Sequence, residues 1–400
     1  MLTTQEALSK LFDLISPLES ELVSIENANG RVLIQDCKAK ISQPSFTSSA
    51  MDGYAINSDD LHSDSELVVI GESAAGHPLE KPITKGQAVR IFTGAVVPEG
   101  ANKVVMQEDV TRIGNTIRFH QNIGSSNYIR SEGSDFQKGF IFKSPKKITP
   151  YDIMLLAGMG FNKIKVTRKP LISVISTGDE LVVPGTKLQK GQIICSNSYG
   201  IKAILEENGA IVNILPIAKD KINSLETAFQ LSEGSDLVIT TGGASVGDHD
   251  LVQQVVGKIG IKTIFYKVAM RPGKPLMAGK SGEFTFVGLP GNPVSSMVCS
   301  HVFLKPMLNK MLGLKYERLK RFQATLTHEL EKNGPREHYM RAMVEDGKAT
   351  VQNNQDSASS SILQRSNALV VRLPNDKRKN VNELVEILCY KIIDTNREHV

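Results

Sequence analysis

Residues Ser235–Asp250 read SDLVITTGGASVGDHD, and this stretch decides how the chain is organised. It begins with a short apolar run rich in β-branched residues, Asp236–Thr240, which is typical of a buried strand. Gly242 and Gly243 end the run, polar residues follow, and apolar residues with helical spacing begin at Leu251. The stretch therefore predicts a buried strand, a glycine loop and a helix, which is the unit from which α/β folds are built.

The glycine loop fits either a structural turn or a ligand site. In an open parallel sheet, ligands bind beside the carboxyl ends of the strands. Paired glycines let backbone N–H groups approach a ligand, and the start of the next helix favours anions. Asp248 and Asp250 at that helix start could cap it, or could hold a cation or a ligand hydroxyl. On this loop alone the two interpretations are equally supported.

Length and composition indicate a globular protein of several domains. A chain of 400 residues exceeds one core of ordinary size, so we expect about two to four domains. Hydrophobic residues make up 40% and charged residues 22% of the chain, as in globular proteins. No apolar run approaches the roughly 20 residues of a membrane span. The N-terminal residues lack a basic segment followed by an apolar block, so we expect no signal peptide.

Cysteine usage and charge narrow the class of function. Four cysteines lie scattered without CxxC or Cys/His spacing, at Cys37, Cys195, Cys299 and Cys389. This pattern predicts a reducing cytoplasm and argues against a zinc site. The net charge of +5 suits an anionic small molecule. No basic stripe is interleaved with aromatic residues, so we expect neither nucleic acid nor a membrane as partner.

Three parts of the chain differ in periodicity. From Pro170 to about Leu312, strands alternate with helices, which predicts a three-layer α/β domain. Short strand candidates between residues 66 and 142 predict a small β domain. Beyond Lys315, short strands and an Asp346-Gly347 hairpin turn predict a C-terminal β domain.

Two polar loops stand apart from these patterns. Residues 43–55 show neither helical nor strand period, and so long a loop is usually functional or disordered. Its interspersed aromatic residues argue against disorder. Asp52-Gly53 fits a tight turn or, alternatively, an exposed carboxylate in a rigid loop. In the second loop, residues 130–135, Asp135 on its own fits a turn cap better than a functional acid.

Four strand ends in the α/β region carry the loops GDE, GGASVGDHD, RPGKP and LPGNP. Together these loops could line one rim of the sheet. The rim would carry four carboxylates and three cations, namely Asp179, Glu180, Asp248, Asp250, Lys267, Arg271 and Lys274. Such mixed charge suits a phosphorylated ligand with a divalent metal. Dinucleotide enzymes, P-loop enzymes and α/β-hydrolases are disfavoured because their motifs are missing from the sequence.

Six motifs carry a resemblance to a known family. They are SSAMDGYA (48–55), RIFTGAVVPEGANKVVMQE (90–108), STGDEL (176–181), TTGGASVGDHD (240–250), MRPGKP (270–275) and GLPGNPVS (288–295). By these motifs the sequence resembles the molybdopterin molybdenumtransferases, the molybdenum insertase family related to the E domain of gephyrin. The resemblance covers essentially the whole chain, and only the C-terminal part matches loosely.

The resemblance implies a reaction and an assembly. The family takes adenylylated molybdopterin and molybdate, cleaves the pyrophosphate linkage with a divalent metal, for which we expect Mg²⁺, and releases AMP. Molybdenum remains on the dithiolene of the molybdenum cofactor. The implied protein is a cytoplasmic homodimer in which the α/β domain of one subunit faces the small β domain of the other. An upstream adenylyltransferase and the acceptor molybdoenzymes are its implied protein partners.

The expected fold is multidomain, α/β plus β. An elongated linking domain would comprise residues 1–25, 42–54 and 139–168, and a small β domain residues 26–41 and 55–138. The α/β molybdopterin-binding domain would span residues 169–313, and a β-barrel-like domain residues 314–400.

Functional residues follow from the resemblance position by position. The implied catalytic residues are Asp52, Asp135, Glu180, Asp220, Asp250 and Lys267. The implied substrate-binding residues are Thr177, Gly178, Gly242, Gly243, Ser245, Asp248, Arg271, Lys274, Pro290, Gly291, Asn292, Arg341 and Ser357. Glu180 and Asp250 would hold the metal. Arg271, Lys274, Arg341 and Ser357 would attract molybdate, since an oxyanion in a cleft needs charge-assisted donors.

Two positions depart from the family pattern. Position 271 is Arg where the family commonly has Lys, which keeps the charge and adds a fork suited to oxyanions. Asp356 precedes Ser357 where the family often has Gly, and a carboxylate that pointed inward there would repel molybdate.

Three alternatives stay open. A molybdopterin adenylyltransferase would share the α/β fold and a TGG-type loop, although the extra β domains and the MDGYA motif argue against it. A scaffold of the gephyrin kind would need a second enzyme domain or a long linker, which this sequence lacks. In the third alternative the glycine loops are only structural turns.

Overall fold

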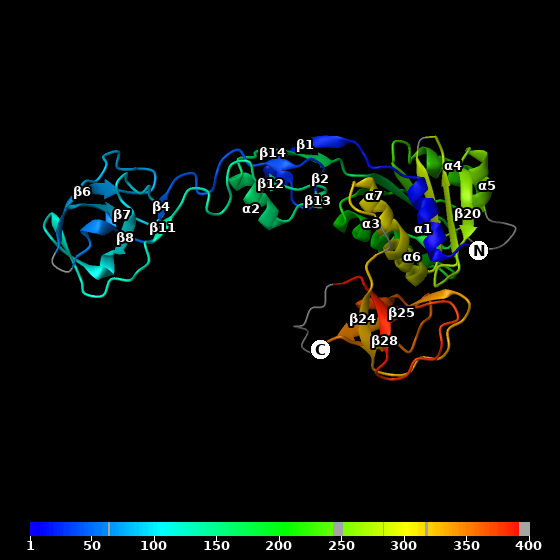
Figure 1. Cartoon of the computed structure of the whole chain (residues 1–400). Helices are drawn as coiled ribbons and strands as arrows, with labels where there is room; N and C mark the ends of the chain where they lie inside the picture. Colours follow the sequence, from blue (N-terminus) through cyan, green and yellow to red (C-terminus); the bar gives the residue numbers. More distant parts are fainter. Residues whose placement is uncertain (63–64, 243–250, 283, 317–318, 392–400) are drawn as a thin grey trace.

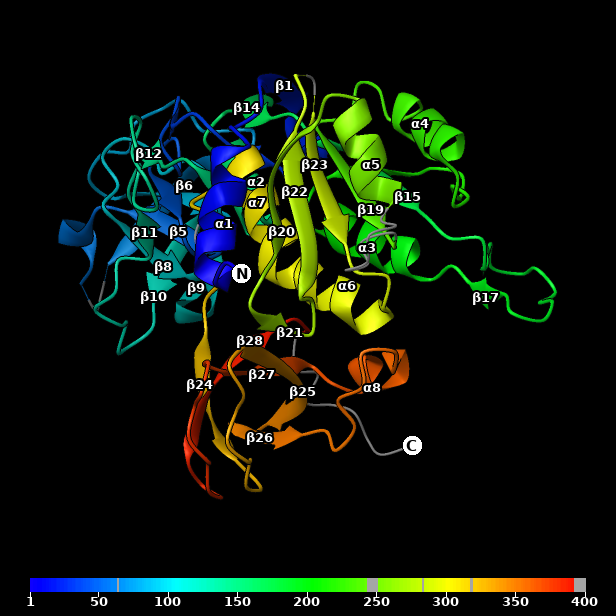
Figure 2. The same cartoon turned by 90° about the vertical axis from the view of Figure 1, so that its right-hand side faces the viewer.

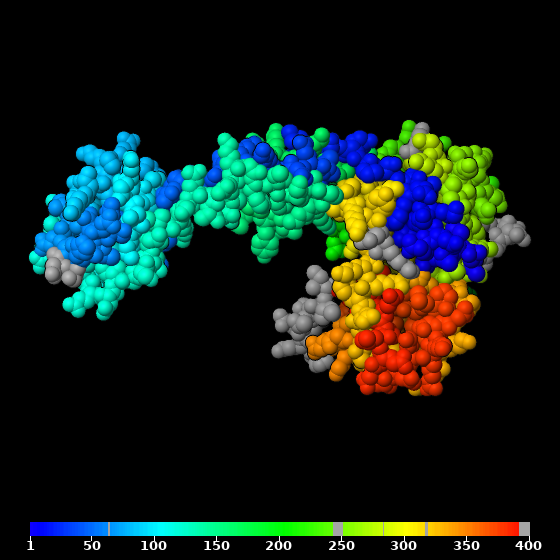
Figure 3. All heavy atoms as spheres, in the orientation of Figure 1, coloured from blue at the N-terminus to red at the C-terminus, as the bar shows by residue number. Residues whose placement is uncertain are grey.

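The computed structural model describes residues 1–400 except 63–64, 243–250, 283, 317–318 and 392–400. Figure 1 shows an elongated molecule with a small β unit at one end, a linking segment in the middle, and an α/β unit and a β-barrel at the other end. In the space-filling view a narrow neck joins the small β unit to the linking segment (Figure 3). Among the described residues, no helix combines the length and the apolar character needed to cross a membrane.

The α/β unit is built on one six-stranded sheet. Its order is β18 (Ile211–Ile214), β15 (Leu171–Ser176), β19 (Leu237–Thr241), β23 (Thr285–Leu289), β22 (Pro275–Lys280) and β20 (Lys262–Lys267). The first four strands are parallel to one another. The residues of β15, β19 and β23 are almost all buried, as expected for strands covered on both faces.

Helices cover both faces of this sheet (Figure 2). One apolar core joins the sheet to α1 (Thr4–Asp13), α3 (Asn197–Glu207), α6 (Pro293–Cys299), a π-helical turn (Ser300–Leu304) and α7 (Lys305–Met311). A second core joins the other face to α4 (Ile222–Gln230) and α5 (Leu251–Lys258). The predicted three-layer α/β architecture is confirmed.

Strand β22 departs from the predicted alternation of strands and helices. It runs antiparallel to β23 and to β20, with Met277 opposite Gly288 and Lys267 opposite Pro275. Its sequence, PLMAGK, follows the RPGKP loop directly and shows no alternation, so it resembles the continuation of a loop. Because β22 is antiparallel, its first residue lies at the carboxyl end of β23. The RPGKP loop therefore reaches the same rim as the glycine loops.

The small β unit is a six-stranded sheet. Its order is β8 (Lys103–Met106), β5 (Gly53–Ile56), β7 (Gln87–Ile91), β6 (Glu66–Ser73), β10 (Thr116–Phe119) and β9 (Val110–Ile113). The loop predicted for residues 43–55 is in part strand, since β4 (Ser48–Ser49) pairs with β11 (Ile129–Arg130) and β5 lies inside the sheet. Gly53 permits this pairing, because a Cβ there would lie 1.9 Å from the carbonyl oxygen of Val105.

The linking segment contains two short strands, β2 and β3, from residues 26–41, which were expected in the small β domain. One sheet orders β1 (Ser20–Ser24), β14 (Lys163–Thr167), β2 (Val32–Leu33) and β13 (Lys146–Lys147), while β3 (Cys37–Lys38) pairs with β12 (Ile141–Phe142). These strands pack against α2 (Pro150–Gly158). The strands of residues 26–41 thus pair here rather than in the small β unit, and α1 packs on the α/β unit rather than on the linking segment.

The C-terminal part is a closed barrel, as predicted. Its strands are β24 (Phe322–Leu326), β25 (Glu337–Glu345), β26 (Lys348–Val351), β27 (Ala368–Arg372) and β28 (Leu384–Cys389), and closure is between β25 and β27. Asp346 and Gly347 have φ angles of 47° and 75° and form the predicted hairpin turn between β25 and β26. The short helix α8 (Ser360–Gln364) lies between β26 and β27. From the α/β unit, β21 (Met270–Arg271) adds to β25 and docks the barrel.

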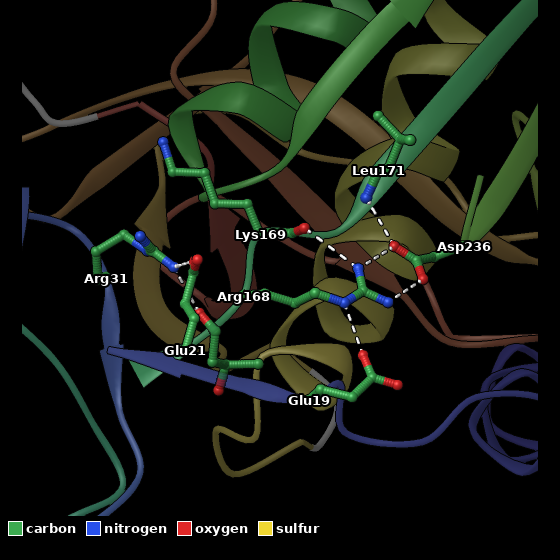
Figure 4. A network of polar contacts seen from close by, with 8 residues as sticks. Glu19, Glu21, Arg31, Arg168, Lys169, Leu171 and Asp236 are labelled. Atoms are coloured by element: carbon green, nitrogen blue, oxygen red, sulfur yellow. Dashed lines mark hydrogen bonds and ion pairs between the residues drawn. The ribbon is translucent and has the colours of Figure 1, made fainter. Parts of the chain in front are cut away.

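An arginine network joins the linking segment to the α/β unit (Figure 4). Arg168 donates to both carboxylate oxygens of Asp236 at 2.7 Å and to Glu19 at 2.7 Å. Asp236 also accepts the N–H of Leu171 at 2.8 Å. These hydrogen bonds, chiefly that to Asp236, raise the pKa of Arg168. The network holds the two units at a defined angle, because a bidentate pair is geometrically specific.

Candidate functional site

The rim of the α/β sheet carries a cavity of about 380 Å³, which we call the glycine cavity. It is lined by loops that follow β15, β19 and β23 and by the start of α3. Its walls include Thr177, Glu180, Cys195, Asn197, Thr241, Gly242, Gly291 and Asn292. The rim that the sequence predicts is therefore present, with three of its loops around one cavity.

Two glycines let the loops of this cavity approach one another. Gly242 has a φ angle of 88°, and a Cβ there would lie 2.6 Å from the carbonyl oxygen of Thr177. A Cβ on Gly291 would lie 3.4 Å from the Cα of Gly242. Backbone therefore forms much of the cavity wall, as in other sites where glycines admit a ligand to main-chain groups.

The polar groups of the glycine cavity are neutral except for one carboxylate. Thr177 is only 3% exposed, and within the part of the chain that is described its hydroxyl has no hydrogen-bond partner. The carboxylate of Glu180 folds over Gly178, whose added Cβ would lie 2.5 Å from it. The thiol of Cys195 donates to the hydroxyl of Ser176 at 3.1 Å. A buried hydroxyl without a partner is costly, so Thr177 is a group that awaits a ligand.

Asp179 and Asp220 form a reciprocal pair beside this cavity. Each carboxylate accepts the backbone N–H of the other residue at 3.3 Å. Both side chains are exposed, and neither lines the glycine cavity. In this conformation Asp220 holds two rim loops together.

A second cavity of about 370 Å³, the basic cavity, lies between the α/β unit and the barrel. It is lined by three cations and several polar residues, namely Arg271, Lys274, Arg336, Ser295, Gln355, Asp356 and Ser357. Within the described ranges, none of the three cations has an ion pair with a carboxylate. Unpaired cations around a cavity make it a site for an anion.

Arg341 stands behind the basic cavity and is fully buried. One of its nitrogens donates to the carbonyl oxygens of Asn354 and Asp356 at 3.2 Å each, while Nε and Nη1 have no partner among the described residues. Burial, and to a smaller extent the nearby Arg271, lowers the pKa of Arg341. A buried guanidinium with two free donor groups is unfavourable unless an anion binds there.

His338 lies in the same positive electrostatic field as Arg341. It is buried on β25, and its Nε2 has no hydrogen-bond partner. Burial and four surrounding guanidinium groups, of Arg271, Arg341, Arg336 and Arg372, lower the pKa of His338 to about 3. The imidazole is therefore neutral at physiological pH.

The two cavities share a wall. The side-chain amide of Asn292 donates to the hydroxyl of Ser357 at 2.8 Å, and the N–H of Val294 donates to the carbonyl oxygen of Ser357 at 3.0 Å. Asn292 lines the glycine cavity and Ser357 lines the basic cavity. The side chains of Asn292 and Ser357 thus meet in the wall between the two cavities.

Two predicted acids lie far from the rim in the same chain. Asp52 and Asp135 belong to the small β unit and its neck, at the opposite end of the molecule from the α/β unit (Figure 1). Asp52 accepts the N–H of Thr93 at 2.7 Å. Asp135 lines a third cavity of about 510 Å³, the arm cavity.

The remaining predicted residues divide into three groups. Lys267 lines neither rim cavity, and its ammonium group lies 5.6 Å from the ring centroid of Tyr266. Pro290 supports its loop, because its carbonyl oxygen accepts the hydroxyl of Ser296. Gly243, Ser245, Asp248 and Asp250 lie outside the described residues. The part of the chain that is described contains no group of three or more His, Cys, Asp or Glu residues suited to a metal ion.

Sequence reasoning missed several residues that line the two rim cavities. Arg336, Ser295 and Gln355 line the basic cavity, and Asn197 and Cys195 line the glycine cavity. Arg336 precedes a barrel strand and has no local motif, so only the docking of the barrel reveals its place. Ser196 directly precedes α3, and a small polar residue at a helix start is a sequence signal by which this segment could have been found.

Comparison with known proteins covers nearly the whole chain. Residues 2–160 match the family described as "MoeA N-terminal region (domain I and II)". Residues 173–310 match the "Probable molybdopterin binding domain", and residues 323–390 match the "MoeA C-terminal region (domain IV)". The three matches follow the same order as the small β unit with its linking segment, the α/β unit and the barrel.

Individual relatives agree with these matches. A molybdopterin molybdenumtransferase of Haemophilus influenzae is 37% identical over 381 residues, which cover 93% of this chain and 94% of that protein. Another molybdopterin molybdenumtransferase, from Nostoc sp., is 34% identical over 355 residues, which cover 85% of this chain and 81% of that protein. A solved structure of the molybdopterin biosynthesis MoeA protein from Pyrococcus horikoshii has a TM-score of 0.80 at 28% identity, covering 98% of this chain and 100% of that chain. This chain belongs to the molybdopterin molybdenumtransferase family.

Proposed function

We propose that this protein inserts molybdenum from molybdate into adenylylated molybdopterin, with release of AMP and formation of the molybdenum cofactor. One observation carries the proposal beyond family membership. A cavity walled largely by backbone and neutral side chains adjoins a cavity of unpaired cations, and the hydrogen-bonded pair of Asn292 and Ser357 lies between them. A transfer of a metal oxyanion to a bound acceptor needs two such neighbouring sites.

The two cavities have different ligands in this proposal. Molybdate binds in the basic cavity, where Arg271, Lys274 and Arg336 surround it and Arg341 supplies its free donors. The phosphates of the adenylylated substrate bind against the glycine loops, where Thr177 donates its unpaired hydroxyl. Ser357 lies at the boundary, and because its hydroxyl oxygen accepts from Asn292, its hydroxyl hydrogen can donate to either ligand.

A divalent metal fits the glycine cavity, and we propose Mg²⁺. Glu180 lines the cavity, and Asp248 and Asp250 follow Gly242, another lining residue, closely in the sequence. Mg²⁺ is commonly held by one or two carboxylates together with substrate phosphates and waters. When bound, such an ion would neutralise the charge that develops on the phosphates during cleavage. In this proposal the carboxylate of Glu180 would hold the ion, and the glycine loops would orient the phosphates.

We further propose a cytoplasmic homodimer whose sites combine two subunits. Asp52 lies between β4 and β5 and Asp135 follows β11, and Figure 1 shows β4 and β11 at the other end of the molecule from the α/β unit. Helix α2 offers an exposed apolar face for pairing, with Tyr151 80% and Met154 72% exposed. Pairing through the linking segments would let each arm reach the rim of the other subunit. The upstream adenylyltransferase and acceptor molybdoenzymes remain proposed protein partners.

Subunit complementation tests the shared site. Chains carrying Asp135→Asn are mixed, unfolded and refolded with chains carrying Arg341→Met, and activity is assayed below KM. In a two-fold dimer with shared sites, one site of each mixed dimer is intact, so about a quarter of wild-type activity returns. If each site were formed within one chain, the mixture would recover no activity.

Light scattering tests the pairing directly, because it measures whether the Met154→Glu variant still forms a dimer. Leu384→Glu, which changes an exposed apolar residue on the barrel, is the control.

The assay that tests the function measures AMP release from adenylylated molybdopterin at fixed Mg²⁺, with and without molybdate. Molybdate-dependent release is the expected result. Tight binding of the adenylate without release under any metal or oxyanion would favour a carrier or scaffold. Net synthesis of the adenylate from ATP and molybdopterin by this chain alone would favour an adenylyltransferase.

A further inference from the structure

The arm cavity is not explained by the proposed chemistry at the rim. It has a volume of about 510 Å³, which lies within the range of small-molecule sites. It lies in the neck, between the segment around β4 and the segment that follows β11. Three kinds of side chain meet in it, an aromatic ring from Phe46, a cation from Arg130 and a carboxylate from Asp135.

These three side chains are free to bind a ligand. Phe46 is 40% exposed although it lines a concave surface. Arg130 and Asp135 have no ion pair or side-chain hydrogen bond within the residues that the structure describes. Asp135 is fixed through its backbone, since its N–H donates to the carbonyl oxygen of Gln43 at 3.0 Å. The backbone at Asp135 is therefore held in place, while its carboxylate has no ion-pair partner among the described residues.

The combination matches one class of heterocycle. The pyrimidine edge of a 2-amino-4-oxopteridine presents two adjacent N–H donors, and the two oxygens of a carboxylate accept both. The corresponding edge of adenine presents one donor and one acceptor, so a carboxylate pairs with only half of it. An aromatic ring such as that of Phe46 provides a stacking surface for a flat heterocycle. Arg130 can donate to the oxo group.

We propose that the arm cavity is a pterin-ring subsite, in which Asp135 accepts the pyrimidine edge and Phe46 stacks on the ring. The proposal rests on the proposed function, because it assigns one part of that reaction's substrate to one part of the chain. The ring binds on the arm of one subunit, and the phosphates and molybdate bind at the rim of the other. Asp135 then acts in binding the substrate.

Asp52 has a positioning role in this subsite. Its carboxylate accepts the N–H of Thr93 at 2.7 Å, and the next residue, Gly94, lines the arm cavity. Gly94 has a φ angle of 81°, and its N–H donates to the carbonyl oxygen of Ser49. Loss of the Asp52 carboxylate would release this turn from the cavity wall without removing any group that contacts the ring.

The test is a fluorescence titration of the full-length protein with free pterin, and with AMP as a second probe. Asp135→Asn replaces one acceptor by a donor that faces the ring N–H, so pterin binding should weaken about 10- to 100-fold. Phe46→Ala should weaken pterin binding at least about fivefold through lost stacking. AMP binding should be unchanged by both substitutions. Glu132→Gln, in the same loop but outside the cavity, and Phe322→Ala, an exposed ring on the barrel, are the matched controls.

Each outcome decides the proposal. It is overturned if wild-type protein does not bind pterin at millimolar concentration, if Asp135→Asn binds pterin normally, or if AMP competes with pterin for the cavity. In turnover, Asp135→Asn and Phe46→Ala should raise KM and leave kcat nearly unchanged. Wild-type activity together with normal KM in both variants would refute the subsite and leave the proposed function standing. Pterin binding that needs Asp135, in a protein without AMP release, would support the subsite and refute the function.

Discussion

Arginine has opposite surroundings at the junction with the linking segment and at the basic cavity. At the junction, Arg168 forms a bidentate pair with Asp236 and a further bond with Glu19 (Figure 4). At the basic cavity, Arg341 is more deeply buried, has only carbonyl partners and keeps two nitrogens unpaired. The pKa of Arg168 is raised, chiefly by its hydrogen bonds to Asp236, whereas burial lowers the pKa of Arg341.

The difference separates cations that stabilise the fold from cations that await a ligand. A guanidinium paired with carboxylates recovers part of the cost of leaving water, and its removal leaves an unpaired carboxylate behind. A guanidinium without such partners lowers the stability of the protein, and a bound anion compensates for this cost by accepting its unpaired N–H donors. Stability and activity should therefore change in opposite ways at the two sites.

The largest effect is expected from Arg341→Met, which removes the unpaired guanidinium while keeping an unbranched apolar side chain. Molybdate-dependent AMP release should fall about 10²- to 10³-fold, the usual cost of removing one oxyanion donor. The melting temperature should stay the same or rise, because no carboxylate loses its partner. Calorimetry and the AMP assay on the same preparation check both expectations. A melting temperature lowered by several degrees, with activity retained, would contradict the assignment.

Arg168→Met should have the reverse effect. Asp236 would lose its bidentate partner, and the free energy of unfolding should fall by about 2 kcal/mol, less than for a fully buried pair. The discount reflects the 35% exposure of the Arg168 side chain. Glu19→Gln is the control, since Glu19 is 76% exposed and should contribute little. Calorimetry measures the change, and kcat of the folded enzyme should remain near that of the wild type.

The sequence predicted the rim far better than the basic cavity, for a physical reason. Gly242, Gly291 and Thr177 follow strands in the sequence, so local periodicity and chain order place them at one edge of the sheet. Arg336 comes to the basic cavity only because β21 adds to β25 and docks the barrel. Pairing between strands far apart in sequence leaves no local trace.

The same limit applies to strand partners. Val32–Leu33 has the same strand propensity whether it pairs within the linking segment or with the small β unit, and the sequence alone does not distinguish these. Strand β22 lacks alternation because both its faces are buried, so its PLMAGK sequence resembles a loop. Periodicity identifies elements whose faces differ, and burial on both faces removes that signal.

A smaller effect should appear in the dependence of stability on pH. His338 has a pKa of about 3 in the folded protein, against 6.5 for an exposed histidine. Between these pH values the unfolded chain binds a proton that the native protein does not, so stability falls as pH decreases below 6.5. At pH 5.5 the loss should reach about 1.4 kcal/mol.

The contribution of His338 is isolated by comparison with His338→Gln. Burial also lowers the pKa of His301, to about 4, so the wild-type protein loses stability to acid at both histidines. The His338→Gln variant should lose less stability than the wild type between pH 7.5 and 5.5, as measured by denaturant unfolding. Equal losses in the two proteins would mean that burial and the four guanidinium groups do not lower the pKa of His338.

The smallest effect tests the one carboxylate that lines the basic cavity. Asp356 accepts the N–H of Ala358 at 2.8 Å, which fixes a turn beside Ser357, and its charge also raises the pKa of Arg341. Asp356→Asn keeps an oxygen that can accept the Ala358 N–H but removes the negative charge. Molybdate affinity, measured by calorimetric titration, should therefore increase about threefold, with less change at high salt because Asp356 is exposed. Asp356→Ala removes both the charge and the turn. If molybdate affinity rises in the Asp356→Asn variant but not in the Asp356→Ala variant, the carboxylate repels the oxyanion and its turn separately places Ser357. A weaker affinity in both variants would mean that the carboxylate supports the cavity through the turn and that its charge does not reach the bound anion.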